Sequence, residues 1–139
     1  MAVITKALTV KTKPDLDIVD ITGQVQKAVQ ESKVKNGIVT AFVPGSTASI
    51  STMEFEPNLV KDVKETLEKL VPKNKEYHHH ETWGDDNGHA HVRATMFGPS
   101  ANIPFKNGKL LLGTWQQLVL LDFDVPARER EIILQIIGE

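Results

Sequence analysis

Residues 38–53, with the sequence IVTAFVPGSTASISTM, decide the fold. Ile38 to Pro44 is rich in β-branched and aromatic residues, which is typical of a buried strand, and Ala48 to Met53 has the same character. Gly45 lies between the two runs, where a turn is needed. The stretch therefore predicts two consecutive strands joined by a turn.

Helices are predicted on either side of these two strands. Upstream, apolar residues recur at helical spacing from Ile18 to Val29, and Asp17 is placed to cap the start of that helix. Downstream, Pro57 suits a first helical position, and an apolar stripe runs from Leu59 to Leu70. We expect both helices to cover the sheet.

Strands account for the remaining predicted elements. Ala2 to Val10 alternates between apolar and polar residues for most of its length, as a strand with one buried face does. Four further strand-like segments follow the second helix, at residues 91–97, 109–112, 118–123 and 131–137. This order predicts one α+β domain over residues 1–139, with a mixed or mainly antiparallel sheet covered by two helices.

The composition narrows the classes of partner. The net charge is −2 and no basic block occurs, so we expect neither a nucleic acid nor an acidic membrane as the partner. The longest apolar run, Leu118 to Leu121, is far too short to span a bilayer, and the N-terminus lacks the pattern of a signal peptide. A cytoplasmic protein that binds a small phosphorylated or anionic metabolite is the expectation.

A histidine cluster is the most informative chemical feature of the sequence. All five histidines lie between His78 and His91, beside Asp85 and Asp86. If a strand begins near His89, then His89 and His91 share a face and can bind one cation, with His80 or an aspartate completing the shell. Because the chain has no cysteine, such a site would hold a divalent ion through nitrogen and oxygen; zinc or manganese suits these ligands better than magnesium.

Each member of this cluster also has a plainer interpretation. His78, His79 and His80 fit a solvated loop, and the two aspartates fit simple support of the turn at Asn87-Gly88. Those alternatives stay open at the level of the sequence.

Other polar residues are candidates for ligand binding or catalysis. Ser46 and Thr47 follow a glycine and can receive a phosphate, although an ordinary turn has the same composition. Glu54 suits a general base or an acid that leads into a helix. In the 113–117 loop, Thr114 and Gln116 can orient a polar ligand while Trp115 can do so or join the core. Arg128 and Arg130 suit an anion clamp or a solvated surface pair.

Several of these segments, taken together and in order, resemble the YjbQ family, small proteins often described as secondary thiamine-phosphate synthases. They are residues 43–50, 80–91, 98–100, 103–104, 107–108 and 112–116 and the terminal Arg-x-Arg, and the Gly-Thr-Trp-Gln motif is the most specific.

The resemblance implies a homotrimer, an active site near the shared histidines, and a weak ability to form thiamine phosphate. It carries over six positions, His80, His91, Glu54, Asp86, Thr114 and Gln116. Many family members have a histidine where this chain has Gly45, and His89 is the nearest imidazole that could replace it.

These inferences predict a metal-dependent enzyme that joins a pyrimidine diphosphate to a thiazole phosphate. In it, His80, His89 and His91 hold the ion, while Ser46, Thr47, Thr114 and Gln116 bind the substrates. Glu54 or Asp86 positions or deprotonates a substrate, and Arg128 neutralises negative charge.

Two alternatives use the same residues: a metal-assisted phosphohydrolase, and a non-catalytic trimer that binds an anionic metabolite or a metal.

Overall fold

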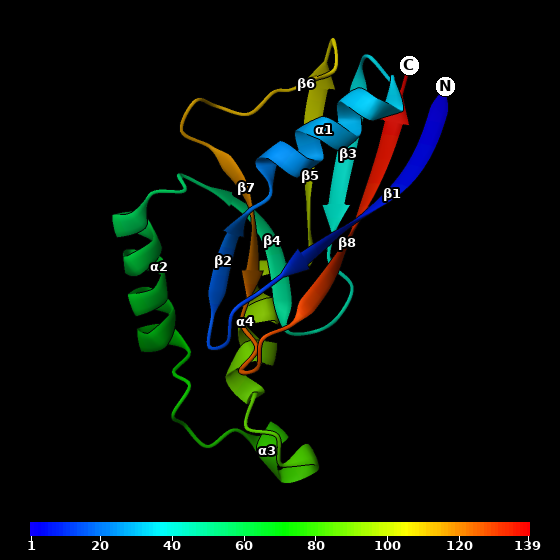
Figure 1. The fold of residues 1–139 in the computed structure, drawn as a ribbon. Coiled ribbons are helices and arrows are strands. Elements are labelled where there is room, and N and C mark those ends of the chain that lie inside the picture. Colours follow the sequence, from blue (N-terminus) through cyan, green and yellow to red (C-terminus); the bar gives the residue numbers. More distant parts are fainter.

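The computed structural model describes all 139 residues and contains eight strands and four helices (Figure 1). In chain order they are β1 (Ala2–Lys11), β2 (Asp17–Asp20), α1 (Thr22–Ser32), β3 (Gly37–Phe42), β4 (Ala48–Met53), α2 (Pro57–Leu70), α3 (His78–Trp83), α4 (Gly88–Phe97), β5 (Ser100–Lys106), β6 (Lys109–Leu110), β7 (Gln117–Asp122) and β8 (Glu129–Gly138).

The strands form two antiparallel sheets. One has five strands in the order β1-β8-β3-β5-β6, and the other has three in the order β2-β7-β4. Every neighbouring pair in both sheets is antiparallel. The predicted α+β domain with a mainly antiparallel arrangement is confirmed. Because β1 and β8 pair from Ala2–Gly138 to Lys11–Glu129, the two termini lie side by side (Figure 1).

Strand β7 is buried on both faces and separates two cores. Leu118 and Leu120 belong to the main core, which fills the space between the two sheets and α1. Val119 and Leu121 face a smaller core that includes residues of α2 and α4. This double burial explains why the longest apolar run of the sequence falls here. It also fixes β7 as the central element from which the site is built.

The opposite face of the five-stranded sheet is open. We call it the outer sheet face and define it by three cross-strand rows, Val3-Ile137-Ile38-Pro104, Thr5-Gln135-Thr40-Asn102 and Ala7-Ile133-Phe42-Ser100. None of these residues is charged, and Val3, Ile38, Phe42 and Ile137 are 62, 51, 41 and 42% exposed. A contiguous uncharged face of this kind is typical of a protein–protein contact.

Two sequence predictions about helices are wrong. The helix expected from Asp17 begins only at Thr22, because Asp17–Asp20 pairs with β7 as strand β2. The strand expected at residues 91–97 is part of helix α4, whose buried positions include His89, Ala90, Arg93 and Ala94. These positions have helical spacing, but two of them carry polar side chains, so a count of apolar residues does not detect the helix.

Helix α3 and strand β5 were not expected from the sequence. Helix α3 occupies the histidine-rich stretch that the sequence suggested to be irregular. Strand β5 contains Pro104, which lowers strand propensity but here points to the outer sheet face. None of the four helices combines the length and the apolar character that crossing a membrane would require.

Candidate functional site

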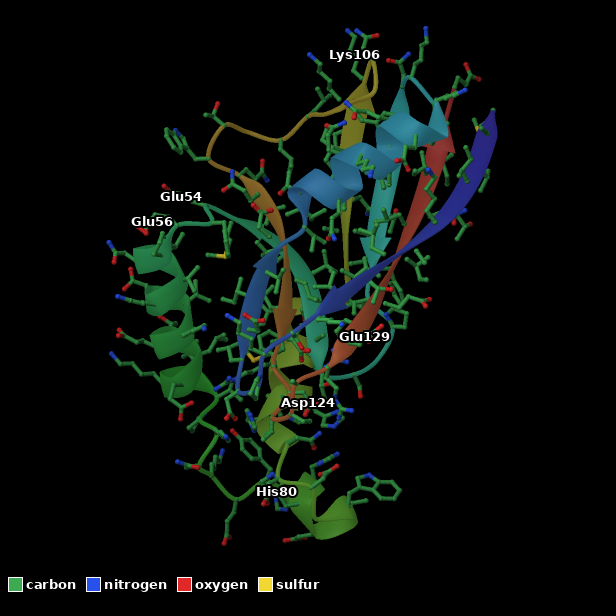
Figure 2. The ribbon with its side chains drawn as sticks, in the orientation of Figure 1. Glu54, Glu56, His80, Lys106, Asp124 and Glu129 are labelled. Carbon is green, nitrogen blue, oxygen red and sulfur yellow. The ribbon has the colours of Figure 1, made fainter.

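The candidate residues separate into two groups at opposite ends of the three-stranded sheet. In the pairing of β4 with β7, Met53 faces Gln117 at one end and Ala48 faces Asp122 at the other. A six-residue strand spans about 17 Å between those ends. In Figure 2, Glu54 lies in the upper half of the view, whereas Asp124 and His80 lie in the lower half. A single chain therefore does not unite all the predicted site residues.

The first group, which we call the tryptophan end, consists of Glu54, Thr114, Trp115 and Gln116. The Gln116 side chain shapes this loop, since its Oε1 accepts from the Gly113 amide at 3.0 Å and its Nε2 donates to Thr52 Oγ1 at 3.1 Å. Trp115 is 75% exposed, so it does not belong to the core. An indole held on an ordered, exposed loop is suited to contact another molecule.

The second group lies where β7 ends, and we call it the histidine end. Its members are polar or charged residues from several elements: Ser46, Thr47, His79, His80, Asp85, Asp86, Asn87, His91, Asp122, Asp124, Arg128 and Arg130. Two buried carboxylates, Asp122 and Asp124, each form an ion pair with an arginine there. Arg130 binds Asp122 through two contacts, Nε to Oδ2 at 2.9 Å and Nη2 to Oδ1 at 2.8 Å. Arg128 binds Asp124 through Nε at 3.0 Å and Nη2 at 2.9 Å.

The two arginines differ in what they can still contact. The Arg130 side chain is 11% exposed, which excludes a solvated surface role for it, whereas the Arg128 side chain is 48% exposed. The Arg128 Nη1 makes no hydrogen bond within the chain. Arg128 can therefore bind an anion while it remains paired with Asp124, and Arg130 serves chiefly to hold Asp122 in place.

Thr47 and Asn87 tie other elements to these charges. The Thr47 hydroxyl donates to Asp124 Oδ2 at 3.2 Å and accepts from Arg130 Nη2 at 2.7 Å. Asn87 Nδ2 donates to Asp124 Oδ1 at 3.4 Å. Thr47 is buried and its hydroxyl is fully engaged, so of the two predicted phosphate-binding hydroxyls only that of the exposed Ser46 is free.

Asp124 is held as a carboxylate by these contacts. Burial acts to raise its pKa, but hydrogen bonds from the Val125 amide, Arg128 and Asn87 outweigh burial and keep the pKa below its ordinary value. A fixed negative charge thus lies under the exposed guanidinium of Arg128.

His91 contacts His79, whose ring centroid lies 4.3 Å away. Burial lowers the pKa of His91 and His79 lowers it further, while Asp85 and Asp124 oppose the shift. His79 in turn lies 3.4 Å from Asp85, measured from Nδ1 to Oδ1. His91 is consequently a neutral imidazole at pH 7, half-buried and able to accept a proton.

His80 is hydrogen-bonded through one ring nitrogen and faces an acid with the other. Its Nε2 accepts from the Gly88 amide at 3.2 Å, and its Nδ1 lies 3.7 Å from Asp86 Oδ1. A Cβ at position 88 would come within 2.6 Å of the Tyr77 side chain and 3.2 Å of His80 Nε2, so the glycine permits this close packing. His80 and Asp86 together fix the entry into α4.

His89 points away from the rest of the histidine cluster. The His89 side chain is 2% exposed and lines a cavity together with Lys73, Arg93 and Phe123. Residues two apart on a helix lie on opposite sides, so the prediction that His89 and His91 share the face of a strand is wrong.

The histidines expected to bind a metal do not converge within one chain. His80 contacts Gly88 and Asp86, His89 lines its own cavity, and His91 packs on His79. No group of three potential metal-binding side chains lies close enough to hold one ion. The metal role of His80, His89 and His91 stays a prediction that the geometry of a single chain does not support.

The buried histidines predict a pH dependence of stability. Burial lowers the pKa of His89, and Arg93 and Lys73 lower it further, against Glu68 and Asp124. A histidine whose pKa is depressed by folding stabilises the protein above its ordinary pKa of about 6.5, and that stability is lost as the pH falls below it. We expect the free energy of unfolding to fall by up to about 1.4 kcal/mol per pH unit for each such histidine.

Urea unfolding at pH 7.5 and pH 5.0, at one protein concentration, measures this loss. It should be smaller in His89→Gln than in the unmodified chain. His78→Gln, which changes an exposed histidine of α3, is the matched control and should behave as the unmodified chain does. Equal losses in all three proteins would contradict the prediction.

Sequence reasoning missed several residues of this end. Asp122, Asp124 and Asn87 were not proposed, and His79 was assigned to a solvated loop although its ring packs against His91. One signal was available, because Asp122 and Asp124 are alternate acids at the end of a fully apolar strand, followed by two alternate arginines. Acids in that position need buried cationic partners.

Comparisons with known proteins identify a protein family to which this chain is similar. The YjbQ profile, described as UPF0047 protein YjbQ-like, matches residues 6–139. A UPF0047 protein of Archaeoglobus fulgidus is 40% identical over 126 residues, which cover 91% of this chain and 96% of the relative. The UPF0047 protein YugU of Bacillus subtilis is 31% identical over 134 residues, covering 96% of this chain and 98% of YugU.

Solved structures agree with these sequence matches. A YbjQ-like protein of unknown function from Sulfolobus solfataricus superposes with a TM-score of 0.93 at 38% identity, covering 99% of both chains. A hypothetical protein from Aeropyrum pernix superposes with a TM-score of 0.91 at 36% identity, covering 98% of this chain and 99% of the other. The two-sheet fold is thus shared across nearly the full length of all three chains.

Proposed function

The chain belongs to the YjbQ family of UPF0047 proteins, and from that membership and the geometry of the histidine end we propose that it is an enzyme acting on a small phosphorylated metabolite. The observation that carries the proposal is the pairing of an anion-binding group with a neutral imidazole at one end of the molecule. The half-exposed Arg128 is paired with the buried carboxylate of Asp124. The negative charge of Asp124 also acts on His91, whose pKa it raises against the effect of burial.

Arg128 supplies the charge that a phosphate group needs. Its Nη1 is free for a ligand, and Asp124 holds the guanidinium in a fixed orientation through two other nitrogens. The exposed Ser46, which adjoins Thr47, adds a hydroxyl that can donate to a phosphate oxygen. An arginine that is oriented before the ligand arrives stabilises developing negative charge without reorganising.

The reaction that the family resemblance implies is the joining of a pyrimidine diphosphate to a thiazole phosphate. In that reaction the carbon–oxygen bond to the diphosphate breaks, diphosphate leaves with the bonding electrons, and the thiazole nitrogen uses its lone pair to form the carbon–nitrogen bond. No proton has to be removed from the thiazole nitrogen. Charge neutralisation at the leaving group is the main requirement, and we assign it to Arg128.

Hydrolysis of a phosphorylated metabolite is the second candidate, and His91 is the observation that favours it. A neutral imidazole that is held against His79 and is reachable from solvent can take a proton from an attacking water. The same Arg128 would bind the phosphate. The two candidates therefore differ in their need for His91.

We further propose that the active assembly is a homotrimer whose sites are completed between subunits. Two observations support this part of the proposal. The predicted residues of one chain lie at two ends about a strand length apart, and the outer sheet face is uncharged and open. A trimer that brings the tryptophan end of one chain to the histidine end of the next would unite Glu54, Thr114 and Gln116 with Arg128 and His91.

The discriminating experiment incubates the protein with both thiamine precursors and quantifies thiamine phosphate and released phosphate. Arg128→Gln should lower kcat/KM about 100-fold or more in either reaction, because an oriented charged donor is lost. His91→Gln should cost about 100-fold in hydrolysis, where proton transfer matters, and far less in coupling. Lys11→Gln, an exposed cation on β1, is the control and should leave the rate unchanged.

The products decide between the candidates. Thiamine phosphate formed at a rate that depends on Arg128 supports coupling, and phosphate released without coupling supports hydrolysis. Tight binding of either phosphorylated precursor without turnover would contradict both and identify a non-catalytic binder.

A further inference from the structure

A second polar cavity lies between helices α2 and α4, on the side of β7 away from Arg128. Its volume is about 200 Å³, and it is lined by six ionisable residues, Asp15, Lys64, Glu68, Lys73, His89 and Arg93. The neighbouring Phe123 also lines it, whereas Asp122 and Asp124 hold the arginines of the histidine end. The cavity is thus separate from the candidate site described above.

Arg93 is a buried cation with one open hydrogen-bonding nitrogen. It is 3% exposed, and the Val71 carbonyl accepts from its Nε at 3.1 Å and from its Nη2 at 2.7 Å. The same Nη2 lies 3.2 Å from Glu68 Oε2. Nη1 makes no hydrogen bond within the chain. A buried guanidinium anchored on one edge presents its remaining N–H groups in a fixed direction.

His89 contributes a second buried polar group. Its side chain lines the cavity at 2% exposure, and its Nδ1 has no hydrogen-bond partner. An unsatisfied buried nitrogen costs about 1–3 kcal/mol, and a hydrogen bond to a bound anion would recover that cost. A neutral imidazole can donate one N–H to an anion.

The charges of the cavity leave one cation in excess. Three cations, Lys64, Lys73 and Arg93, line the cavity with two carboxylates, those of Asp15 and Glu68. With His89 neutral, the net charge of the lining residues is +1. Asp15 pairs with Lys73, and Glu68 pairs with Arg93. Lys64 has no carboxylate partner within the structure, although its side chain is half-buried. An anion would neutralise it.

We propose that this cavity is a binding site for a small oxyanion, a phosphate or carboxylate group, held by Lys64, Arg93 and His89. The volume of about 200 Å³ is below the range of roughly 300–1,000 Å³ that drug-sized ligands occupy, so the ligand is a free anion or a compact metabolite rather than a nucleotide. Bound there, the anion joins α2, through Lys64, to α4. The proposal does not depend on the function assigned to Arg128.

Titration with inorganic phosphate at constant ionic strength tests the site, with the imidazole nitrogen resonances of ¹⁵N-histidine as the readout. The His89 signals, identified by their loss in His89→Gln, should shift with phosphate and saturate. Lys64→Met should weaken phosphate binding roughly tenfold or more, because a charge-assisted contact is lost. Lys69→Met, which changes an exposed lysine of the same helix outside the cavity, should bind as the unmodified chain does.

Two further arms complete the test. Succinate in place of phosphate reports whether carboxylates are accepted. Arg128→Gln must leave the phosphate response of His89 intact, which separates this site from the one at the histidine end. The proposal is overturned if the His89 signals do not respond to either anion, or if Lys64→Met and Lys69→Met bind phosphate equally.

Discussion

Replacing Asp122 with alanine is expected to lower the free energy of unfolding by about 3–5 kcal/mol, the usual cost of removing one partner of a buried ion pair. Asp122 is 1% exposed and accepts two hydrogen bonds from Arg130, whose side chain is 11% exposed. It also accepts from the Thr12 hydroxyl at 2.7 Å and from the Asp124 amide at 3.1 Å. The substitution leaves the buried Arg130 charge with only Asp124, 3.9 Å from Nη2, as a carboxylate neighbour.

Urea unfolding of Asp122→Ala beside Asp62→Ala, an exposed acid of α2, measures this cost. The double variant Asp122→Leu with Arg130→Met should recover part of the loss, because an apolar pair carries no unpaired charge but still removes the acceptor of the Thr12 hydroxyl and the Asp124 amide. A loss below about 1 kcal/mol in Asp122→Ala would mean that water reaches Arg130 and that the pair contributes little.

Placing a charge on the outer sheet face is expected to dissociate the proposed trimer. Ile38 is 51% exposed and lies between Ile137 and Pro104 in the first row of that face. Ile38→Glu would bury an unpaired carboxylate in an apolar contact, which costs several kcal/mol in each interface and so favours separate chains. Analytical ultracentrifugation at low micromolar concentration should report a mass near three chains before the change and near one chain after it.

Leu70→Glu is the matched control, since Leu70 is 65% exposed on α2 and lies outside the outer sheet face. It should leave the mass unchanged. A monomer in the unmodified protein would remove the assembly and every site built between subunits. A trimer that persists in Ile38→Glu would move the contact to another surface.

The fold could be predicted where side-chain periodicity matches burial. Strand β4 occupies Ala48–Met53 and helix α2 occupies Pro57–Leu70, as the sequence indicated. Their patterns were unambiguous because proline marks the helix start and the buried residues are apolar. Helix α4 was missed because its buried face includes His89 and Arg93, while Val92, Met96 and Phe97 are 40, 57 and 44% exposed. In helix α4, polar side chains are thus buried while large apolar side chains are exposed, the reverse of the usual pattern.

The candidate site was less predictable because it depends on pairing between distant residues. Arg128 and Arg130 were recognised as anion-binding candidates, but the acids they bind lie at the end of β7, and only the fold reveals that contact. The histidines were recognised by their clustering, yet the helix turns His89 and His91 apart. Spacing along a sequence predicts which side chains meet only when the secondary structure is already known.

Strand β8 is the second strand of the five-stranded sheet and lies between β1, the first strand of the chain, and β3. During synthesis β1 is made first, but its only partner in the sheet is made last. The paired residues are separated by 118 positions at Lys11–Glu129 and by 136 positions at Ala2–Gly138. The edges of β1 and β3 that pair with β8 must remain unpaired until β8 has emerged. Such long-range closure slows folding and leaves strand edges open to other chains, so a chaperone that shields nascent β1 should raise the yield of native protein.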